Sequence, residues 1–161
     1  MIAPLLALAL LAAEPKALPV DIKALKALPQ VEVKVTERGQ TSTYAGVPLR
    51  ALLLAELGDA GMAQIKELAD AVVTVEAADG YRVAYSAAAL AMDEDGSKYL
   101  LAFTKDGKPL GDEGPARVIV PGEAKHVRWI RNVKSAELGR PPAASPARST
   151  TDAKPPGRSD R

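Results

Sequence analysis

The sequence predicts an α+β domain that combines a mixed β-sheet with short helices. Two Asp-Gly pairs, Asp79-Gly80 and Asp106-Gly107, each separate β-rich runs, which is typical of tight hairpins. Leucines at helical spacing follow Pro48 and give one apolar helix face. Because helical and β-rich segments alternate along the chain, they are expected to build one mixed domain. Hydrophobic residues make up 47% of the 161 residues and aromatic residues only 4%, so the core is expected to be aliphatic.

The first elements of this domain are a strand and two helices. Valines alternate with polar residues over 31–35, which predicts a half-buried strand. The polar stretch 36–43 is expected to form a turn. A helix is predicted over 48–57, because proline is favoured in the first helical turn and Gly58 provides a stop. A second short helix is predicted over 62–68.

The next elements are a hairpin and a capped helix. Val72, Val73 and Val75 lead into Asp79-Gly80, and residues 81–85 are expected to form the returning strand. Ser86 then offers a hydroxyl that caps the first turn of a short helix through Leu90.

Three strands are predicted in the last part of the domain. They are expected over 99–104, over 116–120 and from Trp129 or Ile130 to Leu138, with the second ended by Pro121-Gly122. Trp129 is predicted to be a core residue, because it is the largest side chain of an aromatic-poor domain and lies in an alternating apolar pattern.

The two ends of the chain differ from its middle. Residues 1–13 are predicted to be a signal peptide that directs the protein to the periplasm or outside the cell, the alternative being a buried helix. Their apolar run is shorter than the roughly 20 residues of a membrane anchor. Residues 14–30 are read as a leader, residues 31–138 as the folded body, and residues 139–161 as a disordered, proline-rich basic tail.

Composition excludes several kinds of site. The chain contains no cysteine, so it has no disulfide, thiolate ligand or cysteine nucleophile. Its single histidine, His126, has no second histidine with which to hold a metal ion, and it is expected to be packed or hydrogen-bonded rather than catalytic. The acidic run 93–96 lacks the spacing of a calcium loop and is read as a solvated turn. We therefore predict no catalytic residue and no metal site.

Cations cluster in one segment of the predicted body. Five of them lie between Arg117 and Lys134, where the only acidic residue is Glu123. Such a cluster fits anion binding or, equally well, the solvated faces of strands. The net charge of +1 gives no reason to expect nucleic acid as a partner.

Several motifs follow one another in an ordered series. They are Tyr44-Ala45-Gly46-Val47-Pro48-Leu49, Ala77-Ala78-Asp79-Gly80-Tyr81, Leu100-Leu101-Ala102-Phe103, Asp106-Gly107-Lys108-Pro109-Leu110, Gly114-Pro115-Ala116-Arg117-Val118-Ile119-Val120-Pro121-Gly122 and His126-Val127-Arg128-Trp129-Ile130. The series spans 31–138 and resembles the molybdopterin-binding domain of sulfite-oxidase-type oxidoreductases.

The resemblance implies a sulfite-oxidase-like fold around a pterin cofactor. It also implies that Arg117, Lys125, His126 and Arg128 are the positions that hold the pterin and its phosphate. The molybdenum-ligating cysteine of the family has no counterpart in this chain. Molybdopterin is therefore expected only by resemblance, and no cofactor is predicted from the residues themselves.

Three hypotheses follow for function. The first is an exported domain that binds an anionic small ligand or a periplasmic protein partner, without cysteine-ligated molybdenum catalysis. The alternative is a molybdopterin-dependent oxidoreductase, or a subunit of one, with atypical cofactor binding. The third is an interaction domain whose pocket is filled by side chains. Whether the chain is an enzyme stays open at this point.

Overall fold

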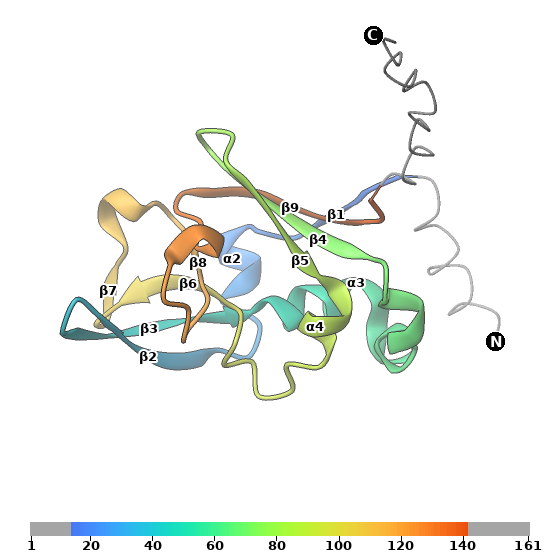
Figure 1. Ribbon diagram of the computed structural model, residues 1–161, viewed down its shortest axis with the longest axis horizontal. Coiled ribbons are helices and arrows are strands. Elements are labelled where there is room, and N and C mark those ends of the chain that lie inside the picture. Colours follow the sequence, from blue (N-terminus) through green and yellow to red (C-terminus); the bar gives the residue numbers. More distant parts are fainter. Residues whose placement is uncertain (1–13, 142–161) are drawn as a thin grey trace, which may run out of the picture.

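The structure, a computed structural model, describes residues 14–141 and contains two antiparallel sheets (Figure 1). The first sheet has the order β1 (Lys16–Leu18), β9 (Val133–Gly139), β4 (Val72–Ala77), β5 (Arg82–Ser86). The second has the order β2 (Val31–Glu37), β3 (Gln40–Pro48), β6 (Leu100–Lys105), β7 (Lys108–Pro109), with β8 (Arg117–Ile119) also paired to β6. The predicted α+β class is confirmed.

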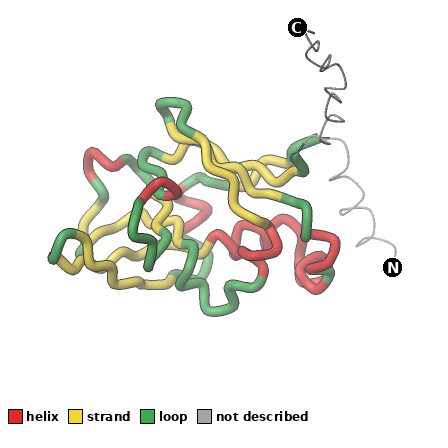
Figure 2. Tube along the Cα trace, in the orientation of Figure 1, coloured by secondary structure: helices red, strands yellow, loops and turns green. Residues whose placement is uncertain are grey.

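The helices are short and gather mostly at one end of the molecule. Figure 2 shows α3 (Leu49–Ala63), η2 (Ile65–Leu68) and α4 (Ala87–Ala91) together on the right, away from the β2–β3 turn. The remaining helical segments are brief and lie between strands: α2 (Ile22–Leu25), η3 (Gly111–Glu113) and η4 (His126–Arg128).

Local rules account for the predicted hairpins and caps. Asp79-Gly80 lies in the β4–β5 turn and Asp106-Gly107 in the β6–β7 turn, as predicted. The Ser86 hydroxyl accepts a hydrogen bond from the backbone N–H of Ala89 at 3.2 Å, which caps α4. Three leucines of α3 that follow Pro48 are buried, as the helical repeat predicts: Leu49, Leu52 and Leu53.

Helix α3 extends beyond the predicted segment. Its helical geometry is interrupted at Gly58, where φ is 65° and ψ is 176°, so the first helical stretch does end at the predicted stop. A further stretch runs to Ala63. The second predicted helix, 62–68, is wrong as one element, because Gln64 leaves helical geometry with ψ of 51° and a 3₁₀ turn follows.

The prediction of a polar turn over 36–43 is wrong except at its centre. β2 continues to Glu37 and β3 begins at Gln40, so only Arg38 and Gly39 form the turn. The hydroxyls of Thr36 and Thr41 lie 2.8 Å apart across the two strands. Threonine suits strands because its β-branched side chain fits the pleated surface, and this preference outweighs the polarity of the stretch.

The last predicted strand begins later than expected. Residues 126–128 form the 3₁₀ turn η4, and Ile130 pairs only with Val118 in an isolated bridge. Asn132 has a φ of 51°, in the left-handed region, which interrupts the extended chain before β9 begins at Val133. Trp129 is buried as predicted, although it lies outside a strand.

The segment expected as a leader contributes to the fold. β1 pairs with β9, from Lys16 opposite Leu138 to Leu18 opposite Ala136, and both Leu18 and Leu25 are buried in the core. Residues 1–13, the predicted signal peptide, and 142–161, most of the predicted tail, lie outside the described residues. No helix within 14–141 has the length and apolar character needed to cross a membrane.

A close backbone approach joins β3 to β6. The pairing shifts register between Ala45 and Gly46, and a Cβ atom at Gly46 would lie 2.0 Å from the carbonyl oxygen of Leu101. Only glycine fits there, because backbone atoms cannot yield as the end of a flexible side chain does. The Tyr-x-Gly-Val-Pro motif is thus explained by sheet packing at its glycine.

We predict that Gly46→Ala lowers the free energy of unfolding by about 1–3 kcal/mol or more, since the added methyl group forces the two strands apart. Gly139→Ala is the matched control, because a Cβ atom at that strand position meets its nearest neighbours at 3.5 Å, an ordinary contact. Urea denaturation of both variants measures the difference. Equal stability of the two variants would show that β3 and β6 do not approach so closely.

Candidate functional site

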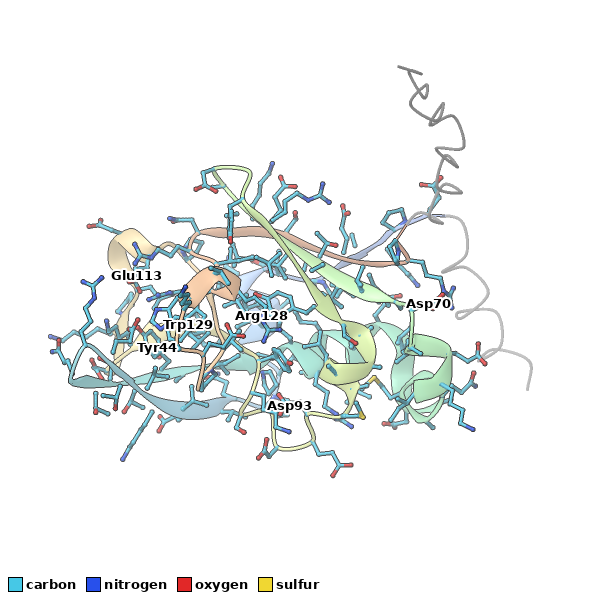
Figure 3. All side chains as sticks on the ribbon, viewed as in Figure 1. Tyr44, Asp70, Asp93, Glu113, Arg128 and Trp129 are labelled. Atoms are coloured by element: carbon cyan, nitrogen blue, oxygen red, sulfur yellow. The ribbon has the colours of Figure 1, made fainter. Side chains whose placement is uncertain are left out.

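Trp129 is the centre of an aromatic cluster. Figure 3 labels Trp129 together with two neighbouring residues of the site, Tyr44 and Glu113. Its indole N–H donates to the backbone carbonyl oxygen of Val120 at 2.9 Å, which satisfies the buried donor. The His126 ring stacks on the indole with centroids 3.9 Å apart and planes 13° apart. Tyr44 meets the indole edge-on at 6.4 Å. The cluster joins β3 to the segment after β8.

Arg117 lies beneath this cluster and is only 3% exposed. Its Nη1 donates to Glu113 Oε2 at 2.7 Å and to the Tyr44 hydroxyl at 3.2 Å. The guanidinium carbon lies 5.0 Å from the centroid of the Trp129 ring, within the range of a cation–π contact. A buried cation is tolerated only when a counter-charge faces it, and Glu113 supplies that charge.

The Nε atom of Arg117 is buried and has no hydrogen-bond partner among the described residues. A buried N–H group without an acceptor costs about 1–3 kcal/mol. The guanidinium therefore keeps one donor for an acceptor that the chain itself does not supply within 14–141.

Tyr44 links Arg117 to a second carboxylate. Its hydroxyl accepts from Arg117 and donates to Glu37 Oε2 at 3.2 Å. The other oxygen of that carboxylate lies 3.1 Å from His126 Nδ1. Burial raises the pKa of Tyr44, so its hydroxyl stays protonated and able to donate. The four side chains form one continuous polar chain from β8 through β3 and β2 to η4.

Two clefts are lined by members of this chain of side chains, with volumes of about 470 and 620 Å³. Three cationic or ionisable residues line both clefts: Arg117, His126 and Arg131. The first cleft is also lined by Asp79 and Tyr81 from the β4–β5 turn and by Asn132, which directly precedes β9. The second contains the three glutamates Glu37, Glu113 and Glu123. The buried Arg117 thus lines both clefts.

Carboxylates face most of the clustered cations. Arg131 Nε lies 4.0 Å from Glu113 Oε1, and Arg128 Nε donates to Glu123 Oε1 at 2.6 Å. The hydrogen bond that Arg128 donates to Glu123 is the main reason why the pKa of Arg128 is raised. Three arginines of the basic patch therefore face carboxylates, and one of the two acids involved, Glu113, lies outside the basic segment.

The four residues expected to hold a cofactor take different places. Arg117 and His126 are brought together in the clefts. Arg128 is engaged with Glu123 and lies over the Tyr99 ring at 5.9 Å. Lys125 is exposed on the loop before η4.

Three residues of the site were not expected from the sequence: Glu37, Tyr44 and Glu113. Arg131 belongs to the predicted cation cluster, for which anion binding was one of the two interpretations. Tyr44 belongs to the Tyr-x-Gly-Val-Pro motif, so a signal was present. For Glu37 and Glu113 no local pattern distinguishes them from solvated acids.

Two tyrosines of the β4–β5 hairpin fix the backbone of η4. The Tyr81 hydroxyl donates to the carbonyl oxygen of Val127, and the buried Tyr85 hydroxyl donates to that of Arg128. Desolvation by burial raises the pKa of Tyr85 strongly, which keeps it a donor. These contacts hold His126 and Trp129 in place from the opposite sheet.

Comparison with protein-family models gives one match. Residues 28–141 match the oxidoreductase molybdopterin binding domain. That range covers most of the chain and contains all the residues of both clefts. No curated protein sequence matches the chain. The resemblance found in the ordered motifs is confirmed.

We predict that Trp129→Ala lowers the free energy of unfolding by about 3–5 kcal/mol, because it removes a buried ring together with its stacking contact with His126 and its hydrogen bond to Val120. Val127→Ala is the control two residues away, since Val127 is 63% exposed and should change stability by no more than about 0.5 kcal/mol. Denaturant unfolding followed by circular dichroism gives both values. A loss for Trp129→Ala as small as that of the control would show that the ring is not a core residue.

Proposed function

The chain belongs to the oxidoreductase molybdopterin-binding domain family, and we propose that it binds a small ligand bearing an oxyanion group. The ligand would lie in the clefts lined by Arg117, without a cysteine-ligated molybdenum centre. The observation that supports this proposal most is the buried Arg117, whose Nε–H has no acceptor within the described chain. A ligand oxygen that accepts from this atom would satisfy it. Arginine is well suited to this role, because its planar donors match carboxylate and phosphate groups.

The residues of the pocket do not fit the molybdenum cofactor as the resemblance implies it is held. The whole sequence contains no cysteine, so no thiolate is present to bind the metal. Within 14–141 there is also no group of three or more His, Asp or Glu residues placed to hold a metal ion. In addition, Arg117 and Arg128, cations that a cofactor phosphate would need, are already paired with Glu113 and Glu123.

Charge balance narrows the ligand class. Arg117 is already paired with Glu113, and the nearby Arg131 faces the same carboxylate. A ligand of high negative charge would meet three glutamates in the larger cleft. A single oxyanion on an otherwise neutral or weakly charged molecule is the better match, with Arg117 donating from the floor and Arg131 from the rim.

A second candidate is a molybdopterin-dependent oxidoreductase, or a subunit of one, with atypical cofactor binding. The family match over 28–141 favours it, since the matched family is defined by that cofactor. Arg117, Lys125, His126 and Arg128 would then hold the pterin, as the resemblance implies. The two candidates differ in one measurable property, the molybdenum and pterin content of the protein.

The proposed setting is the periplasm or the exterior of the cell. The apolar run over 2–13, which breaks at Glu14-Pro15, supports export through a signal peptide. N-terminal sequencing of the protein from its host should find a chain that starts after Ala12 or Ala13, and a chain that retains Met1 would contradict export.

Titration of the purified protein with inorganic phosphate and with acetate tests ligand binding. Trp129 is the only tryptophan of the chain and stacks on a cleft residue, so its fluorescence reports on the site alone. We expect a saturable change with at least one of the two anions, at constant ionic strength kept with chloride. Arg131→Ala should weaken binding several-fold, because Arg131 lines both clefts.

Lys125→Ala is the matched control, since it removes one exposed cation of the same segment. It should leave the titration unchanged. Lack of a saturable change with either anion, or equal weakening by the two variants, would contradict oxyanion binding at Arg117.

A further inference from the structure

A groove separate from the Arg117 clefts lies along α3. Its volume is about 320 Å³. Its walls are mainly apolar and come from the segment before β2, the end of β3 and one face of α3: Leu28, Pro29, Val31, Pro48, Ala51 and Leu54. None of these residues takes part in the contacts around Trp129. The groove therefore needs an explanation of its own.

The loop that forms one rim of the groove is rigidly held. Asp93 is buried, and its Oδ2 accepts from the backbone N–H groups of Lys98 and Tyr99 at 3.2 Å each. Gly96 has a φ of 68°, and a Cβ atom there would lie 2.2 Å from Pro48 Cγ, so the loop is packed directly against the groove wall. Figure 3 shows Asp93 on this loop at the lower side of the molecule.

The rim is negatively charged. Glu94 and Asp95 are exposed on the rigid loop, beside the apolar walls. Arg50 is the one cation among the lining residues of this groove, and its Nε donates a hydrogen bond to the carbonyl oxygen of Ala91 at 3.0 Å. An occupant that combines small apolar groups with flanking cations matches this surface.

The chain itself contains such a segment beyond the described residues. Lys154-Pro155-Pro156-Gly157-Arg158 places two prolines between two cations, and residues 142–161 hold four cations against two aspartates. We infer that this C-terminal segment docks in the groove, with the prolines against the apolar walls and the cations at Glu94 and Asp95. Proline loses little conformational entropy on binding, because its φ is fixed in advance.

The connecting length permits this docking. Arg140 is fixed by its Nε bond to Asp70 Oδ1 at 2.9 Å, so the tail departs from a defined point near η2. Thirteen residue steps separate Pro141 from Lys154 and span up to about 43 Å when extended. A domain of the described size has a radius of gyration of about 14 Å. The extended connection is therefore about three times as long as this radius, a length compatible with docking in the groove.

A spin label in the full chain tests the inference. Because the sequence has no cysteine, Ser159→Cys provides a unique attachment site for a nitroxide next to the docking segment. In an isotope-labelled sample at low salt, the backbone amides of Leu54 and Gly96 should relax several-fold faster than that of Val127, which lies at the other site. Adding Glu94→Lys should remove this selective effect, and adding Lys154→Glu to that variant should restore it.

A mixed sample identifies the occupant. Isotope-labelled protein without a nitroxide is combined with spin-labelled protein without isotope, so that only contacts between copies are seen. Intrachain docking predicts no selective relaxation in this mixture. Selective relaxation of the groove amides there would overturn the inference in favour of the tail of a second copy. Uniform relaxation in the single-chain experiment would overturn it as well, and neither result would affect the anion titration at Arg117.

Discussion

The buried positive charge of Arg117 is the constraint on which the site depends. A guanidinium removed from water must be neutralised, and Glu113, four residues earlier in the chain, does so at 2.7 Å. Tyr44 and Trp129 then enclose it from β3 and from the segment after η4. Because Tyr81 and Tyr85 of the other sheet hold the η4 backbone, the position of Arg117 is tied to both sheets. The shape of the site thus depends on the burial of this charge as much as on apolar packing.

This arrangement gives a physical account of how a member of the family is built without a cysteine. The pocket has a buried cation, three lining glutamates and a histidine stacked on an indole. Two of the carboxylates balance the charges of Arg117 and Arg128, and this balance is the reason why we propose a ligand of low charge. The Arg117 Nε donor has no acceptor among residues 14–141, and the ligand that we propose would supply one.

The elements that the sequence predicted are those set by local rules. The hairpins at Asp79-Gly80 and Asp106-Gly107, the Ser86 cap and the helix after Pro48 each depend on neighbouring residues. β3 was missed because its polar first half is a strand only through pairing with β2 and β6, which sequence periodicity does not reveal.

The same distinction applies to the site. Arg117 and His126 were found because they stand within one motif-rich segment. Glu37 and Tyr44 reach them through contacts between residues 89 and 73 positions apart, which a single sequence does not record. Glu113 is only four residues from Arg117, but no local pattern distinguishes it from a solvated acid. The sequence therefore predicts the basic patch but not the acids that lie against it.

The central claim is that this pocket is organised around a buried arginine and not around a cysteine-ligated molybdenum centre. The most direct measurement is the molybdenum content of protein purified from its own host, together with the fluorescent oxidation product of any released pterin. Our account predicts neither molybdenum nor pterin in stoichiometric amount. One molybdenum atom and one pterin per chain would contradict it and would support the oxidoreductase with atypical cofactor binding.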